Sequence, residues 1–276
     1  MKSLNRLLRR VCGWAIRRRT ALTFLIVFAA IFLRYLTFGA EYCWQHDDYI
    51  QYISFPLSGN YIGLLIEQGL LVSRPLAAVT DLLVWARFSQ NMIISVMLVS
   101  ALYAGSALLW QSVLGRRYGT GICFIVLYTL LPLNFEGSYW LSASTRIICG
   151  LFFTSLAVWL LVRFVEDTRP VCGILYFPAL LLSYAYYEQT LVLSVAASLL
   201  LMLGYLFERR PRALLALSTF AAAGVYLWFT SLFAGDGGAI AARMELAIPN
   251  NPYYFKTYFF CNLSYLFSGL ILNTFK

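Results

Sequence analysis

The sequence predicts an all-α integral membrane protein with about eight transmembrane helices and with interfacial helices in a long first extracytoplasmic loop. Of the 276 residues, 61% are hydrophobic and only 12% are charged, which is about half the charged fraction of a typical soluble domain. Apolar runs that approach or exceed the roughly 20 residues needed to cross a bilayer recur along the chain. The expected spans cover residues 20–40, 91–114, 119–134, 143–165, 171–186, 188–207, 213–233 and 257–273.

Residues 1–19 form a basic segment that we expect to lie on the cytoplasmic side of the membrane. Seven of the 21 basic residues fall within it. Its apolar residues share one helical face and its arginines the other, which is typical of an interfacial helix on anionic lipid; a disordered basic tail is the alternative. The apolar stretch from Thr20 to Phe38 is too long for a signal peptide, so we interpret it as a retained span.

The apolar run 171–207 is too long for a single span. Polar residues in the stretch Tyr186-Tyr187-Glu188-Gln189 interrupt it. We therefore expect two antiparallel helices with a tight connection between them. Pro178 is expected to kink the first of the two.

The charge distribution predicts a cytoplasmic N-terminus. With eight spans, segments 1–19, 116–117, 163–169 and 208–212 and Lys276 fall on one side, with 15 of the 21 basic residues and only three of the 12 acidic ones. The other acidic residues fall on or near the opposite side. Because cytoplasmic loops are enriched in Lys and Arg, we expect a multi-pass protein of the inner cell membrane with its basic side in the cytoplasm.

The first extracytoplasmic connection, residues 41–90, differs from the short cytoplasmic ones. It is rich in aromatic and aliphatic residues, unlike a flexible linker. Segments 61–71 and 75–88 are predicted to be amphipathic helices on the membrane surface, and Pro75 suits the first position of the second one. Residues 20–276 are thus expected to form one polytopic membrane domain.

The strongest local signal is the stretch His46-Asp47-Asp48-Tyr49, soon after the first span. Two adjacent carboxylates beside aromatic rings at a membrane surface are poorly explained by packing, and ionisable groups near hydrocarbon are costly. Asp47 and Asp48 are therefore candidate catalytic residues: one carboxylate would serve as a general base on a sugar hydroxyl, or the two would bind a cation. The alternative is an ordinary hydrated acidic loop.

Two arginines are candidate ligands of an anion. Arg74 precedes Pro75 and suits bidentate binding of phosphate oxygens, or anchoring to lipid headgroups. Arg146 lies about one turn into a predicted span, where its charge requires an acidic or phosphate partner. Glu136, in the preceding connection, is the acidic partner that we expect for it.

The remaining candidate substrate-binding residues are mostly aromatic. Tyr49, Tyr139, Trp140 and Tyr187 are expected to stack on a sugar ring or to line a lipid site, or else to belong to the aromatic belts of the membrane interface. Glu188 is expected at the start of a helix, where the helix dipole favours a negative charge, and it is also a candidate for substrate binding.

Several functional classes are excluded by missing motifs. The six cysteines show neither CxxC nor zinc-ligand spacing. No nucleotide-binding loop, HExxH motif or nucleophile elbow is present. The positive charge is explained by membrane topology, so no nucleic-acid partner is expected. No motif for a cofactor is found. The Asp-Asp pair beside His46 is compatible both with a bound divalent cation and with a site that needs no metal.

These features resemble the GT-C superfamily of membrane glycosyltransferases, and most closely the bacterial families that modify O-antigen or other surface polysaccharides. The resemblance covers roughly residues 15–210 and is carried by Asp47-Asp48-Tyr49, by Arg74-Pro75-Leu76, and by the connections that contain Tyr139-Trp140 and Glu188. Members of this superfamily have more spans, so a short or truncated member is expected.

The resemblance implies inverting transfer of a sugar from a polyprenyl-phosphate donor to a hydroxyl of a cell-surface glycan or lipid. It implies Asp47 as the general base and Asp48 as the residue that positions either Asp47 or the acceptor. Arg74 and Arg146 would bind the departing lipid phosphate, and the polyprenyl tail would lie among the helices with membrane lipids. Two alternatives stay open, namely a transporter or flippase of lipid-linked saccharides and a non-catalytic subunit of an envelope assembly.

Overall fold

A computed structural model describes residues 18–36, 46–54, 57–67, 69–89, 91–130 and 141–233 of the chain. About 90% of this structure is helical and the described ranges contain no strand. The expected all-α class is therefore confirmed. The basic segment 1–17 and the last expected span, 257–273, lie outside the described residues.

Five helices in the described ranges are long and apolar enough to cross a membrane. A sixth apolar helix, α12 (Pro170–Tyr186), is slightly shorter, and α9 (Ile122–Leu130) has nine residues. The count of eight spans stays a prediction. The five long helices are α2 (Arg19–Leu36), α8 (Met92–Tyr118), α11 (Leu141–Asp167), α13 (Thr190–Phe207) and the segment Pro211–Leu232, made of the 3-10 helix η5 (Pro211–Leu217) and most of α14 (Ser218–Phe233).

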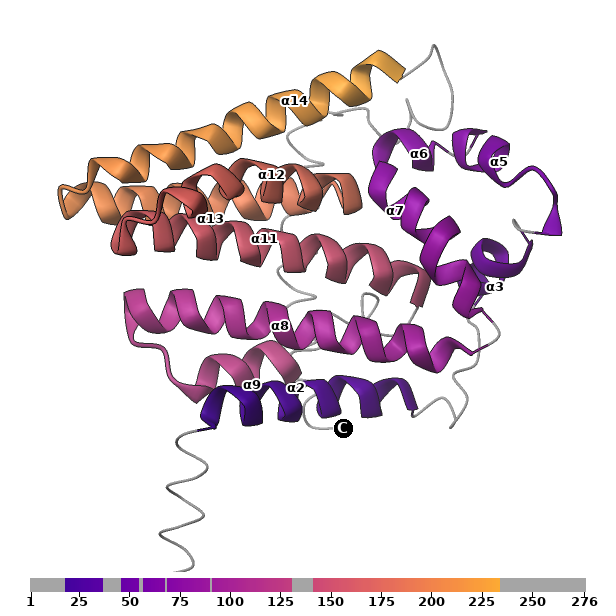
Figure 1. Ribbon diagram of the computed structural model, residues 1–276, viewed down its shortest axis with the longest axis horizontal. Helices are drawn as coiled ribbons and strands as arrows, with labels where there is room; N and C mark the ends of the chain where they lie inside the picture. Colours follow the sequence, from indigo (N-terminus) through magenta and orange to yellow (C-terminus); the bar gives the residue numbers. More distant parts are fainter. Residues whose placement is uncertain are drawn as a thin grey trace, which may run out of the picture.

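The long helices lie side by side as a bundle with α11 near its middle (Figure 1). On one side α11 packs against α8, which in turn packs against α2, and on the other side it packs against α12. Small and β-branched residues such as Ala104, Ala107, Ala157 and Val158 are completely buried at these contacts. Small residues let helix backbones approach closely, which is the main source of helix association in lipid.

The expected split of the long apolar run is confirmed. Helix α12 ends at Tyr186 and α13 begins at Thr190, and the two helices run in opposite directions (Figure 1). Pro178 lies inside α12, where its ring removes one backbone hydrogen bond.

Charged residues lie at the two ends of the bundle. The helix ends that carry Arg19, Arg117, Arg169 and Arg210 meet at one end, at the left of Figure 1, and the helices of the first loop cover the other. Arg117 pairs with Glu208 at 2.7 Å and stacks on the ring of Tyr205. Glu166 and Asp167 also lie at this end and pair with arginines. The orientation of the bundle in a membrane stays a prediction.

The first loop folds into a series of short helical segments rather than two helices. The segment 75–88 is continuous, as predicted, and Pro75 is its first residue. The prediction of one helix over 61–71 is wrong: Gly69 adopts a left-handed backbone with φ of 68° and separates two helices. Glycine takes this conformation without steric cost and so ends helices. The segments are α3 (His46–Tyr49), the π-helical turn η1 (Ile50–Ser54), α5 (Tyr61–Glu67), α6 (Leu70–Ser73), α7 (Pro75–Thr80), the π-helical turn η2 (Asp81–Trp85) and the 3-10 turn η3 (Ala86–Phe88).

The carbonyl end of the short helix α9 is held by side chains from two neighbouring helices. The Tyr103 hydroxyl donates to the Tyr128 carbonyl at 2.5 Å, and Arg34 Nη2 donates to the Thr129 carbonyl at 2.7 Å. The last carbonyls of a helix have no partner within the helix and are costly in hydrocarbon. A cation there also complements the helix dipole, which accounts for an arginine near the end of α2.

Candidate functional site

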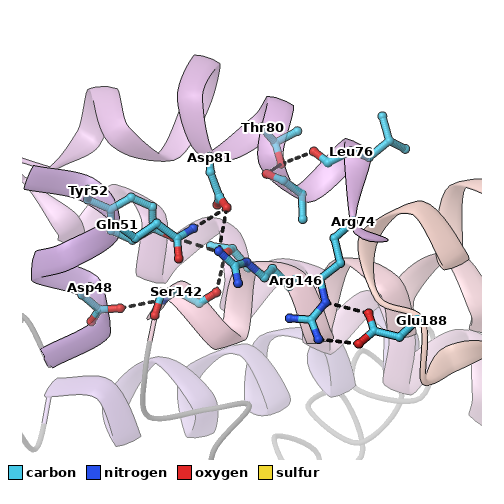
Figure 2. A network of polar contacts seen from close by, with 12 residues as sticks. Asp48, Gln51, Tyr52, Arg74, Leu76, Thr80, Asp81, Ser142, Arg146 and Glu188 are labelled. Carbon is cyan, nitrogen blue, oxygen red and sulfur yellow. Dashed lines mark hydrogen bonds and ion pairs between the residues drawn. The ribbon is translucent and has the colours of Figure 1, made fainter. Parts of the chain in front are cut away.

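Polar side chains from four separate parts of the chain meet at the loop-covered end of the bundle (Figure 2). They come from α3 and η1, from the segment that runs from Arg74 through η2, from the first two turns of α11, and from the connection between α12 and α13. We call this set the polar network. Its members are Asp48, Gln51, Tyr52, Arg74, Asp81, Ser142, Thr145, Arg146, Tyr187 and Glu188.

The two adjacent carboxylates have different environments. Asp48 is completely buried, and its Oδ1 accepts a hydrogen bond of 2.6 Å from the backbone N–H of Ser142, at the start of α11. The first N–H groups of a helix have no partner within it and favour a negative charge, so Asp48 ties α3 to α11. The Asp47 side chain is exposed, as is that of Tyr49. Of these two carboxylates, that of Asp47 is accessible from solvent and that of Asp48 is not.

Arg74 makes a two-point ion pair with Glu188. Its Nε and Nη2 donate to the two carboxylate oxygens at 2.6 and 2.5 Å, and its guanidinium lies over the Tyr187 ring, 4.8 Å from the centroid. Burial by itself would raise the pKa of Glu188, but the hydrogen bonds and charge of Arg74 outweigh it and hold the pKa below its usual value. Glu188 therefore stays ionised: its carboxylate is bound by Arg74, and a backbone N–H adds to the lowering of its pKa.

Tyr226 of α14 adds a further contact at this junction. Its hydroxyl donates to the carbonyl of Ser73 at 2.6 Å, one residue before Arg74. The bend between α6 and α7 is thus held by α14 on one side and by the α12–α13 connection on the other. These contacts leave Arg74 a defined position, with three of its five N–H donors outside the Glu188 pair.

Arg146 pairs with an acid that the sequence analysis did not single out. Its Nη2 lies 3.1 Å from Oδ2 of Asp81, and the exposed fractions of the two side chains are 12% and 1%. The side-chain amide of Gln51 donates to the same carboxylate oxygen. The expected partner, Glu136, lies outside the described residues, so the Arg146–Asp81 pair is the acidic contact that the structure adds.

The carboxylate of Asp81 is perturbed by its surroundings. Burial raises its pKa from 3.8 to about 6, and the neighbouring charge of Arg146 opposes the rise without cancelling it. Tyr52, whose hydroxyl lies 3.2 Å from the Thr145 hydroxyl, packs against the same region. Perturbed acids of this kind cluster at functional sites.

Five members of the polar network were not predicted as site residues, namely Gln51, Tyr52, Asp81, Ser142 and Thr145. Asp81 falls within the predicted amphipathic helix 75–88, where one acid is readily assigned to the polar face. One signal in the sequence could have indicated that Asp81 is buried: it is followed directly by the apolar residues Leu82, Leu83, Val84 and Trp85. Asp81 is the first residue of the π-helical turn η2, and Asp48 lies two residues before η1; π-helical turns occur frequently at functional sites.

Other predicted site residues are not placed by the structure. Tyr139 and Trp140 lie outside the described residues, as does the side chain of His46. In the described ranges, no group of three or more His, Cys, Asp or Glu side chains is arranged to hold a metal ion. Binding of a divalent cation by Asp47 and Asp48 therefore stays an untested possibility.

Comparison of the chain with protein-family models, with curated proteins and with solved structures gives no match. The chemistry that bears on function is that of the polar network, which has an exposed acid beside a buried one and two arginines that are each bound by a carboxylate.

Proposed function

We propose that the protein is a membrane glycosyltransferase of the GT-C type, which moves a sugar from a polyprenyl-phosphate donor to a hydroxyl on the extracytoplasmic face. One observation carries the proposal. The exposed carboxylate Asp47 adjoins Asp48, which is fixed to the start of α11, at the same end of the bundle as Arg74 and Arg146. Transfer of a glycosyl group from a lipid phosphate needs a base and a cationic phosphate site close to each other.

In the proposed reaction, the acceptor oxygen attacks the anomeric carbon of the donor sugar. Asp47 takes the proton of the acceptor hydroxyl as the new C–O bond forms. The bond between the anomeric carbon and the phosphate oxygen breaks, and the lipid phosphate leaves with the bonding electrons. Arg74, through donors that Glu188 does not use, and Arg146 would stabilise the charge that develops on this phosphate.

The aromatic candidates would bind the sugar. In the proposal Tyr49, Tyr139, Trp140 and Tyr187 offer ring faces, and Glu136 accepts hydrogen bonds from sugar hydroxyls. Tyr187 lies against the guanidinium of Arg74, next to the proposed phosphate site. The polyprenyl tail would lie against the apolar outer surfaces of the helices, where large side chains such as Leu193 and Trp228 are exposed.

The proposed topology has eight spans in the inner cell membrane, with residues 1–19 in the cytoplasm and the loop 41–90 outside. It is tested by labelling single cysteines in a cysteine-free variant. A membrane-impermeant thiol reagent added to intact cells should modify Leu57→Cys, which is on the exposed loop, and should not modify Arg212→Cys, at the basic end. After the membrane is permeabilised, both should react. The reverse pattern would contradict the orientation.

The activity itself is tested by mass spectrometry of surface polysaccharide and glycolipid from bacteria that express the full chain. The wild-type protein should add a hexose-sized or similar mass to one glycan species. The variant Asp47→Asn/Asp48→Asn, at matched membrane expression, should not. An added mass that persists in the double variant would overturn the catalytic assignment, and no added mass from the wild type in any donor-competent host would overturn the function.

A further inference from the structure

The two arginines of the polar network differ in how their counterions are held. Glu188 contacts Arg74 through both oxygens and stays ionised. Asp81 contacts Arg146 through one oxygen at 3.1 Å, is completely buried, and shares that oxygen with the amide of Gln51. In the described ranges the direct acidic contact of Arg146 is therefore a single, weaker one in a poorly solvated position, and Glu188 acts on Arg146 only through longer-range electrostatic attraction.

Arg146 retains capacity for a second anion. Its Nε is buried and donates to no acceptor in the described ranges. Only its Nη2 is engaged by Asp81, whereas a guanidinium carries five N–H donors. An unsatisfied buried donor is costly, and an anionic oxygen that reaches the guanidinium would relieve this cost.

The other groups that act on Asp81 are mostly neutral. Arg74 is the second cation within electrostatic reach of the carboxylate. The tyrosines on the surrounding elements and one cysteine of α11 are uncharged near neutral pH. The titratable and charged groups facing Asp81 are Tyr52 on η1, Tyr61 on α5, Arg74 between α6 and α7, Arg146 and Cys149 on α11, and Tyr186 on α12.

We propose that Asp81 is the counterion of Arg146 in the ligand-free protein, and that an anionic phosphodiester bound at Arg146 takes over this role, so that binding is coupled to the uptake of one proton by Asp81. A second negative charge beside Arg146 destabilises the ionised form of Asp81. The protonated carboxyl is neutral and still offers an oxygen to Gln51 and Arg146. The inference rests on the proposed function for the identity of the ligand, but not for the coupling.

The sign of the coupling follows from the position of Asp81. Its pKa is already raised to about 6 by burial against the opposing charge of Arg146, and a bound anion raises it further. Anion affinity should therefore increase as the pH falls from above the pKa of the bound state to below about 6, and then level off. The increase is about tenfold for each unit by which the anion raises the pKa.

The test uses the purified full chain in a neutral detergent, with farnesyl methyl phosphate as the probe, because this phosphodiester keeps a single charge across the pH range. Calorimetric titrations from about pH 8 to about pH 5, in buffers with different ionisation enthalpies, report both affinity and proton uptake. Near pH 7, the wild type should take up a measurable fraction of one proton per probe bound. Farnesol, which lacks the phosphate, and dimethyl phosphate, which lacks the lipid, show which part of the probe is recognised.

The variant Asp81→Asn should bind the probe at least as tightly as the wild type does at low pH, with no pH dependence and no proton uptake. The matched control Asp167→Asn, which removes a carboxylate paired with arginine at the opposite end of the bundle, should keep the wild-type pH profile. Failure of the wild type to bind the probe, binding without proton uptake, or an unchanged pH profile in Asp81→Asn would each overturn the proposal. Should Asp81→Asn not fold, the proton uptake of the wild type still decides.

The outcomes also separate this inference from the proposed function. Proton-coupled binding of the probe without any detectable sugar transfer would sustain the counterion role and refute the glycosyltransferase. Sugar transfer that depends on Asp47, together with proton-independent binding of the probe, would sustain the glycosyltransferase and refute the counterion role of Asp81.

Discussion

Asp47→Asn is expected to lower the rate of sugar transfer about 10²- to 10⁴-fold, the usual contribution of a general base. Asparagine keeps the size of the side chain but cannot accept the proton of the acceptor hydroxyl. Because the Asp47 side chain is exposed, the thermal stability of the variant should match that of the wild type. The measurement is the initial rate of glycan modification in membranes supplied with donor lipid, normalised to the amount of protein.

The neighbouring substitution Asp48→Asn provides the comparison. Asp48 is buried and accepts the backbone N–H of Ser142, so its replacement should lower stability as well as activity, since the amide is a weaker cap than a carboxylate. Asp47→Asn with wild-type activity would show that Asp47 is not the base, and equal effects of both variants on stability would show that the two carboxylates do not differ in role.

Arg146→Met is expected to lower the free energy of unfolding by about 3–5 kcal/mol near neutral pH, because it leaves Asp81 buried without its countercharge. The variant Arg146→Met/Asp81→Leu should recover most of this loss, since an apolar pair needs no compensation. The measurement is denaturant or thermal unfolding of the purified chain in detergent. The control Arg163→Met removes a pair with Asp167 whose partners are 24% and 26% exposed, and it should cost less than about 1 kcal/mol.

The loss in Arg146→Met should depend on pH in a defined direction. In the wild-type fold the pKa of Asp81 is raised from 3.8 to about 6, so the folded state binds this proton more tightly than the unfolded chain does. The stability contributed by protonation is complete below pH 3.8 and is lost as the pH rises through about 6. Without Arg146, Asp81 keeps its uncompensated charge at high pH and loses it by protonation at low pH. The difference in free energy of unfolding between wild type and Arg146→Met should therefore be larger near pH 8 than near pH 5. A difference that grows at low pH would contradict the assignment to Asp81.

Much of the fold was predictable because its signals are local. A run of apolar residues specifies a span without reference to any other segment, since each helix in lipid satisfies its own backbone hydrogen bonds. The interruption at Tyr186 to Gln189 and the helix start at Pro75 were predicted for the same reason and are confirmed. The difference over 61–71 also has a local cause: a glycine inside a predicted helix, here Gly69, is able to adopt the left-handed backbone that separates α5 from α6.

The partners of the site residues were not predictable in this way. Arg74 and Glu188 are 114 residues apart, and Arg146 and Asp81 are 65 apart. Topology places acids and arginines at one end of the bundle, but several acids there are formally available to each arginine. The choice depends on how α7 and η2 pack on α11 and α12, and this packing is decided by side-chain shape across many contacts.

The sequence by itself determined that the chain is helical, that several of its segments are long and apolar enough to cross a membrane, and that acidic residues and a few arginines fall in the connections opposite the most basic ones. These properties follow from composition and spacing, which act over a helix or a single turn. Only the tertiary structure decided that Asp48 is buried while Asp47 is exposed, and that Arg146 is held by Asp81. Burial and ion pairing are properties of surfaces that meet in space, and a buried charge is stable only where a partner from another segment arrives.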